Sequence, residues 1–166
     1  MMIKKVITPI YTLTLCTFLT LSCSTEKPEA VGFNGWLSGS TNEKLNTVSN
    51  HLRGFDMAMA ETGYRYVELY WAGVDENWEY AEYQVDKIKL AISNGFERRP
   101  LRKESGEHFM NNVLPEMKSA VGKKDSSDFF RTFEIMTVNC NACHALEKVP
   151  FFNIQIPETR QSPVKK

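Results

Sequence analysis

The residues with the most specific chemistry in this chain are Cys140-Asn141-Ala142-Cys143-His144. On a helix, residues three positions apart lie on one face, so both thiols can bond to one side of a planar cofactor. A histidine directly after the second cysteine can then bind a metal at the centre of that cofactor. Cys-x-x-Cys-His is the attachment signature of c-type haem. The spacing therefore predicts one covalent haem c on Cys140 and Cys143, with His144 as the proximal iron ligand.

Three other uses of the two thiols compete with haem attachment. A thioredoxin-like redox pair opens a helix in a βαβ unit, whereas this motif stands near the end of a helical run. A structural zinc site needs a fourth ligand, and His51 and His108 stand at no metal-ligand spacing. A plain disulfide is the third alternative. The compartment predicted from the other end of the chain favours haem.

The N-terminal stretch reads as a bacterial signal peptide that ends in a lipid-attachment site. A basic start is followed by an apolar run, which Leu-Ser-Cys closes at Cys23. We expect residues 1–22 to be removed and Cys23 to be lipidated as the new N-terminus. Thr20 departs from the usual lipobox, which has an aliphatic residue there. A membrane-spanning anchor is the alternative, but the run is short and interrupted by Pro9 for a span of about 20 residues.

Export agrees with the cysteine and charge counts. Cys16 leaves with the signal peptide, Cys23 carries lipid, and the two motif cysteines carry haem, which is attached outside the bacterial inner membrane. Loss of Lys4 and Lys5 leaves 18 basic residues against 20 acidic ones. That balance gives no basic field for nucleic acid. We therefore predict a periplasmic or cell-surface protein that is anchored to a bacterial membrane by its lipid.

The mature chain divides into three parts by composition. Residues 23–39, with Pro28 and three glycines, predict a flexible tether. Residues 40–157 predict one domain that is long enough to bury a real core. The apolar stretch Val149–Pro157 is expected to fold back over the haem edge and restrict water. Residues 158–166 are polar and basic, and predict a disordered tail that frays.

Apolar residues in steps of three and four predict four amphipathic helices. The first opens at the capping box Ser40–Glu43 and runs to about Gly73, with a core face of Leu45, Val48, Leu52, Phe55, Met59, Thr62, Tyr66 and Leu69. Asp75 is predicted to cap the second helix, which ends before Pro100 and buries Trp78, Ala81, Val85, Ile88, Ile92 and Gly95 or Phe96.

The third predicted helix spans about Glu104–Val121. Pro115 either kinks it or lies in the first turn of a helix that starts near Asn112. The fourth helix begins at an Asp125 cap, and its core face is Phe129, Phe133, Met136, Cys140 and Cys143. No stretch alternates with period two for long enough to predict a sheet. The predicted fold is all-α, an antiparallel four-helix bundle with the haem site near the C-terminal end of its last helix.

From roughly Met57 to Pro157 the chain resembles the class II cytochromes c, of the cytochrome c′ and cytochrome c-556 type. It is similar above all to exported bacterial haem proteins of that type. The features that match are Tyr70-Trp71-Ala72-Gly73, Asn77-Trp78, Leu114-Pro115, the Cys-x-x-Cys-His motif, and Pro150-Phe151-Phe152 with Ile154-Gln155. The resemblance implies a four-helix bundle and gives the haem roles to Cys140, Cys143 and His144.

The sixth coordination position of the iron then decides the function. In class II cytochromes with methionine ligation this ligand comes from the first helix, where the chain has Met57 and Met59. Met59 lies on the predicted core face, whereas Met57 points about 200° round from Phe55, so Met59 is the predicted ligand. His51 and His108 are expected at the surface. The candidates for the haem pocket are Trp71, Trp78, Phe133, Phe151 and Phe152.

Together these features predict a mono-haem electron carrier and no enzyme, since no nucleophile–base pair or paired carboxylates suggest acid–base catalysis. An open sixth position would instead give a five-coordinate haem protein that binds or senses small gases. A third reading is a haem subunit tethered to a larger membrane redox complex.

The basic cluster Arg98, Arg99, Arg102 and Lys103 reads as a solvated loop, with haem propionates as its alternative partners. Class II relatives are often dimers, although no exposed apolar stripe in the sequence demands one.

Overall fold

The computed structural model describes residues 29–166, so the predicted signal peptide and Cys23 lie outside the described part. Between residues 29 and 166 the chain is helical and forms no strand; Val31 and Leu37 form an isolated bridge. No helix in that range is both long and apolar enough to cross a membrane. The chain divides into two compact units, one ending at His51 and the other starting at Leu52.

The first unit contains a closed loop where the sequence predicted a flexible tether. The amide N–H of Val31 donates to the carbonyl of Leu37 at 2.8 Å, and the reverse bond measures 3.0 Å. The 3-10 turn η1 (Phe33–Gly35) lies between them. Gly32 and Gly35 have φ values of 82° and 68°, which a residue with a Cβ adopts only with strain. The glycines that suggested flexibility therefore build a specific turn.

Helix α2 (Thr41–Leu52) begins at the predicted capping box. The Ser40 amide donates to Glu43 Oε2 at 2.7 Å, and the Glu43 amide donates to Ser40 Oγ at 3.4 Å. No residue of α2 is buried. The expected core positions Leu45, Val48 and Leu52 are all exposed.

The prediction of one continuous first helix is wrong, because the chain breaks between α2 and α3 (Phe55–Val74). Arg53 has a φ of 59°, in the left-handed region that ends helices. Asp56 holds the break, since its carboxylate accepts from the Gly54 amide at 3.0 Å and pairs with Arg53. The spacing of apolar residues continues across the break. It does not depend on the φ of a single residue, so it could not predict where the helix ends.

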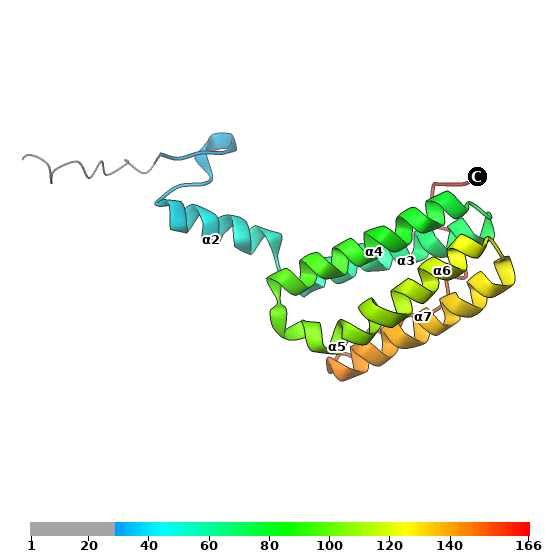
Figure 1. Cartoon of the computed structure of the whole chain (residues 1–166). Helices are drawn as coiled ribbons and strands as arrows, with labels where there is room; N and C mark the ends of the chain where they lie inside the picture. The colour runs from blue at the N-terminus through cyan, green and yellow to red at the C-terminus, as the bar shows by residue number, and fades with distance from the viewer. Residues whose placement is uncertain (1–28) are drawn as a thin grey trace, which may run out of the picture. The chain divides into compact units, whose positions relative to one another are not determined.

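In the second unit four long helices surround one core (Figure 1). Helix α3 packs against α4, α4 against α6, α6 against α7, and α7 against α3. The all-helical prediction is confirmed, and the arrangement is compatible with a bundle. The bounds are α4 (Trp78–Arg98), η2 (Pro100–Arg102), α5 (Lys103–His108), η3 (Phe109–Val113), α6 (Leu114–Lys123) and α7 (Ser126–Leu146).

The predicted core face of α4 is confirmed, and that of α7 is confirmed as far as Cys140; Cys143 does not pack against the core. The buried residues include Ala81, Val85, Ile88, Ile92 and Gly95 on α4, and Phe129, Phe133 and Met136 on α7. Helix α3 approaches α7 most closely at Gly73, where a Cβ would lie 2.0 Å from Phe129 Cε1. Aromatic side chains from α7 therefore fill the space that a glycine leaves on α3.

Of the two predicted aspartate caps, one is correct. Asp125 caps α7, accepting from the Asp128 amide at 2.7 Å. Asp75 does not cap α4; it follows the last turn of α3, and Asn77 accepts from the Tyr80 amide at 3.4 Å instead. Both side chains can cap, so local sequence did not decide between them.

The helix that contains Pro115 does not restart near Asn112. It runs from α5 through the π-helical turn η3 into α6 without a break. Proline lacks the N–H that would bond the carbonyl four residues earlier, and its ring crowds that carbonyl. A π turn directly before Leu114 widens the backbone there, so the chain stays helical past the proline, while its direction changes between α5 and α6 (Figure 1).

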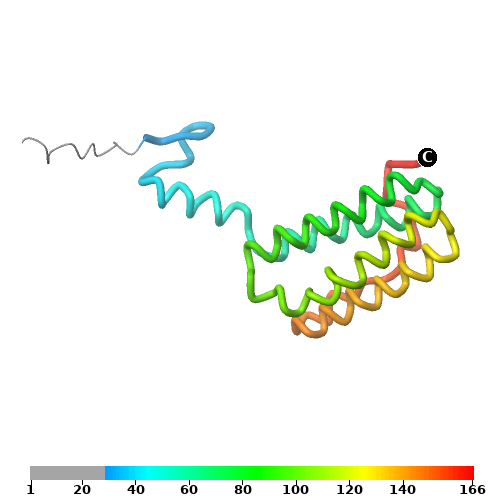
Figure 2. Tube along the Cα trace, viewed as in Figure 1, coloured from blue at the N-terminus to red at the C-terminus, as the bar shows by residue number. Residues whose placement is uncertain are grey.

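After α7 the chain runs back along the bundle to the turn between α3 and α4 (Figure 2). We call residues 149–166 the C-terminal strap. Where the sequence predicted a frayed tail, Arg160 makes two bonds to Asp75, at 2.6 and 2.8 Å. The Ser162 hydroxyl donates to the buried Glu68 at 2.7 Å. These partners stand about ninety residues apart in the chain, and local composition gives no sign of them.

Candidate haem site

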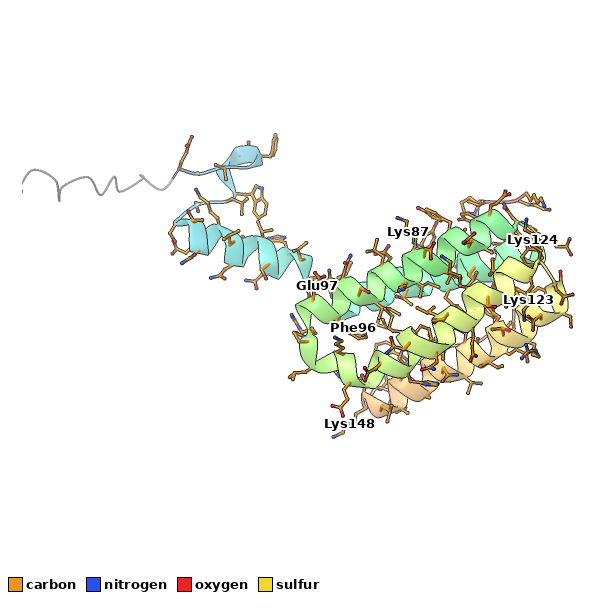
Figure 3. The ribbon with its side chains drawn as sticks, in the orientation of Figure 1. Lys87, Phe96, Glu97, Lys123, Lys124 and Lys148 are labelled. Atoms are coloured by element: carbon orange, nitrogen blue, oxygen red, sulfur yellow. The ribbon has the colours of Figure 1, made fainter. Side chains whose placement is uncertain are left out.

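The Cys-x-x-Cys-His motif occupies the last turns of α7. In Figure 3, Lys148 and Phe96 mark this end of the second unit, whereas Lys123 and Lys124 mark the opposite end. Cys140 and Cys143 are both free thiols, one helical turn apart. The turn thus offers two uncombined sulfurs on neighbouring positions of one helix face.

Cys140 is the thiol on the core side. It is half-buried and packs against the hydrophobic core, and burial raises its pKa to about 12. Tyr66 lies close by, with its hydroxyl 2.7 Å from Thr137 Oγ1. Burial also raises the pKa of Tyr66 to about 12. Both groups stay neutral at physiological pH, which keeps this side of the site uncharged.

Cys143 lies on the side of α5, where its neighbours are the polar side chains of Ser105 and Arg102. Burial raises the pKa of its thiol, while a hydrogen bond from Ser105 and the charge of Arg102 act in the opposite direction. Arg102 forms an ion pair with Glu147, to which the Ser105 hydroxyl also donates. This member of the basic cluster therefore has an acidic partner, where the sequence favoured a solvated loop.

His144 is held in one orientation by the strap. Its Nδ1 lies 2.6 Å from the carbonyl oxygen of Phe152. A carbonyl only accepts, so Nδ1 donates this bond, and in the neutral ring Nε2 then keeps its lone pair. Metal-binding histidines are commonly oriented by a bond of this kind from the other ring nitrogen. The tautomer is the one that a proximal ligand needs.

Asn141, between the two cysteines, has a role that the sequence did not reveal. Its Nδ2 donates to the carbonyl of Ile154 at 2.8 Å, and the Ile154 amide donates to its Oδ1 at 2.7 Å. The motif turn is thus tied to the strap at both Asn141 and His144. In the sequence, the one hint of this contact is that a polar residue, Asn141, stands between the two cysteines. The expectation that the stretch after the motif folds back is confirmed for these residues.

The two candidate methionines on α3 differ as the helical spacing predicted. Met59 is half-buried and packs against the core, whereas Met57 is 41% exposed. The two alternative histidines lie at the surface, as expected. The ring of His51 packs on Trp36 in the first unit, and His108 ends α5.

Two of the five candidate pocket aromatics lie away from the motif, and a third, Phe133, lies in the core against Tyr66. Trp78 packs on Phe129, which precedes Cys140 by eleven residues, about 16 Å along a helix. Trp71 lies under the guanidinium of Arg160, 4.7 Å from its ring, beside the α3–α4 turn. Phe133 is fully buried in the core, against Tyr66 and Tyr70. Spacing along the chain placed Trp78 and Phe133 on core faces without saying at which end.

The other two aromatics stand at the motif, on the solvent side. Phe152 lies edge-on to His144, with ring centroids 6.4 Å apart, and Phe151 packs on Phe152 at 4.7 Å. Phe151 is 74% exposed. Two surface hollows, of about 330 and 260 Å³, lie elsewhere on the second unit and include no motif residue.

The donor set fits covalent haem c: two free thiols one turn apart, followed by a histidine with Nε2 available. Within residues 29–166, no three His, Cys, Asp or Glu side chains come together as a metal cluster. No family model, curated protein or solved structure matches the chain. The chain's own residues therefore carry the functional proposal.

Proposed function

We propose that this protein is a mono-haem c-type cytochrome that carries single electrons in the bacterial cell envelope, anchored by lipid on Cys23. The observation that carries the proposal is the His144 Nδ1 bond to Phe152, next to the free thiols of Cys140 and Cys143. Bound through those thiols, haem would supply a reversible one-electron iron couple.

The register of α3 against α7 supports Met59 as the sixth ligand. Gly73 lies against Phe129, and Tyr66 lies against Thr137, a register that supports opposite directions for α3 and α7. Two further turns along each helix lead from Tyr66 to Met59 and from Thr137 to His144. Met59 and His144 therefore fall at one level.

The protein's part in this function is to hold the ligands still. Asn141 and Phe152 fix the motif turn to the strap, and the half-buried Met59 packs against the core. Ligands that are held in place in both oxidation states need little reorganisation when an electron arrives. Burial keeps Cys140 and Tyr66 uncharged, so one side of the proposed site carries no charge from these two groups.

The first experiment tests covalent attachment. The full chain is produced in cells with a working cytochrome maturation system, denatured, and extracted with acid acetone. We expect the pigment to stay with the polypeptide and the mass to equal the chain plus one haem. The Cys140→Ser/Cys143→Ser variant should lose it. Pigment that leaves the wild-type chain, or a mass of bare polypeptide, contradicts the proposal.

The second experiment tests the sixth ligand. We expect the ferric protein to show an iron–thioether absorption band that disappears in Met59→Ala and persists in the exposed control Met57→Ala. The reduced wild type should bind carbon monoxide slowly, and Met59→Ala rapidly. Rapid, tight binding by the wild type without that band would identify a gas-binding protein. Stable co-purification with a membrane oxidoreductase would instead make the protein a subunit of that complex.

A further inference from the structure

Helix α2 presents an exposed apolar stripe, formed by Leu45 and Val48 of the first unit and by Leu52, the first residue of the second. Leu45, Val48 and Leu52 are 61%, 37% and 56% exposed. At 100° per residue these three side chains fall within an arc of about 60°. Asn46 and Asn50 lie on the opposite face. A helix with one narrow apolar stripe and a polar back, which also carries Glu43, favours a partner along that stripe.

The closed loop before α2 adds an aromatic tip to the same unit. Phe33, between the bridged residues Val31 and Leu37, is 86% exposed. The Trp36 ring packs on His51 of α2 at 5.0 Å, which joins the loop to the helix. A Cβ on Gly32 would lie 2.6 Å from Trp36 Nε1, so the loop depends on that glycine. The structure thus builds a turn whose most exposed side chain is a phenylalanine.

The charges of this region fit an uncharged apolar partner. Between residues 24 and 53 the acidic residues are Glu26, Glu29 and Glu43, and the basic ones are Lys27, Lys44 and Arg53. The two sets balance, so neither an acidic nor a basic surface would attract the segment. The contact must come from apolar burial.

The proposed lipid on Cys23 would keep this unit at a bilayer. Val31 follows Cys23 by eight positions in the chain, a reach of at most about 28 Å. We infer that the first unit lies on the membrane surface, with the α2 stripe and Phe33 inserted among the lipid headgroups. This inference rests on the proposed lipid anchor, which raises the local concentration of bilayer around the unit.

The test measures membrane binding by the α2 stripe and Phe33 in the absence of the proposed lipid on Cys23. The mature chain carries Cys23→Ser behind an ordinary cleavable signal, so no acyl chain is added, and is floated with phosphatidylcholine vesicles. We expect it to partition to the vesicles, with little change on adding anionic lipid or salt. Leu45→Gln/Leu52→Gln should lower the partition coefficient about tenfold. The control Leu90→Gln/Leu101→Gln, at leucines 50% and 95% exposed in the second unit, should not.

Two results would overturn the inference. One is a wild-type chain that does not float, or a loss of equal size in both double variants. The other is a concentration-dependent dimer that Leu45→Gln/Leu52→Gln abolishes, which would make a second copy the occupant of the stripe. The mass of the native N-terminus is measured separately. An unacylated Cys23 would contradict the proposed anchor alone. Flotation would still show whether the α2 stripe and Phe33 bind the membrane.

Discussion

Asn141 and Ile154 bind each other through two hydrogen bonds, Nδ2 to the carbonyl at 2.8 Å and amide to Oδ1 at 2.7 Å. Asn141 stands between the two motif cysteines. Two residues before Ile154, the carbonyl of Phe152 orients His144. The position of the strap and the position of the imidazole are therefore coupled. A strap that detaches would free the ring that is proposed to bind iron.

Replacing Asn141 should loosen the strap. We expect Asn141→Ala to lower the free energy of unfolding by about 1–2 kcal/mol, because two hydrogen bonds to the strap are lost. Asn139→Ala is the matched control, since the Asn139 amide donates only to Ile135 within the same helix, at 2.8 Å. Denaturant unfolding gives the free energies, and hydrogen exchange of the Ile154 amide reports the strap itself. Equal losses in the two variants would show that the contact does not hold the strap.

The two glycines of α3 should respond to alanine in opposite directions. Gly73→Ala places a methyl group 2.0 Å from Phe129 Cε1, so we expect a loss of about 1–3 kcal/mol through overpacking. Gly63 has no neighbour within 4 Å of a built Cβ. Gly63→Ala should therefore gain about 0.5–1 kcal/mol from helix propensity. Urea unfolding of the two variants checks the pair, and a gain at Gly73 would mean that α3 and α7 do not meet there.

The ion pair that fastens the strap should make stability depend on pH in the acid range. The hydrogen bonds from Arg160 are the main cause that lowers the pKa of Asp75 below its ordinary 3.8. A carboxyl with a lowered pKa in the folded state stabilises the fold above the unfolded-state value, and this contribution disappears as pH falls through the folded-state value.

Asp75→Asn isolates that contribution. We expect the wild type to be more stable than the variant at pH 5–7, and the difference to shrink as pH falls below 3.8. Thermal unfolding from pH 7 to pH 2 measures it. Other carboxylates also titrate in this range, so only the difference between the two proteins is informative. A difference that stays constant down to pH 2 would contradict the assignment.

The two thiols should alkylate slowly in the chain before haem is attached. Burial raises the pKa of Cys140 to about 12, so little thiolate exists at pH 8. We expect the iodoacetamide rate at Cys140 to rise nearly tenfold per pH unit between pH 7 and 9. Peptide mapping separates Cys140 from Cys143, which has a hydrogen bond from Ser105 to offset its burial. A rate at Cys140 that levels off near pH 8.5 would show an exposed thiol.

Several features of the fold were predictable because they depend on neighbours in the sequence. Helices α4 and α7 bury most of the residues that their three-and-four spacing selected, and Asp125 caps α7 as predicted. The contrast between Met57 and Met59 follows from the same angle of 100° per residue. The break at Arg53 was missed because it depends on one residue's φ, which apolar spacing does not encode.

In the candidate site, too, some features follow from neighbours in the sequence and others depend on distant contacts. The types and order of Cys140, Cys143 and His144 define the proposed chemistry with no structure at all. The sequence could not tell that Trp71 and Trp78 lie at the far end of the second unit, because core faces on a long helix repeat every turn. It also gave no sign of Arg160 binding Asp75, since the two are 85 residues apart.

By itself, the sequence determined the helical composition and the placing of the motif in the last turns of a helix. These properties follow from side-chain chemistry and a period of 3.6 residues. Only the tertiary structure decided which end of the core is near the motif and where the strap runs. It also decided that the Phe152 carbonyl orients His144. Those depend on contacts between segments that are distant in the chain, which the packing of the whole core selects.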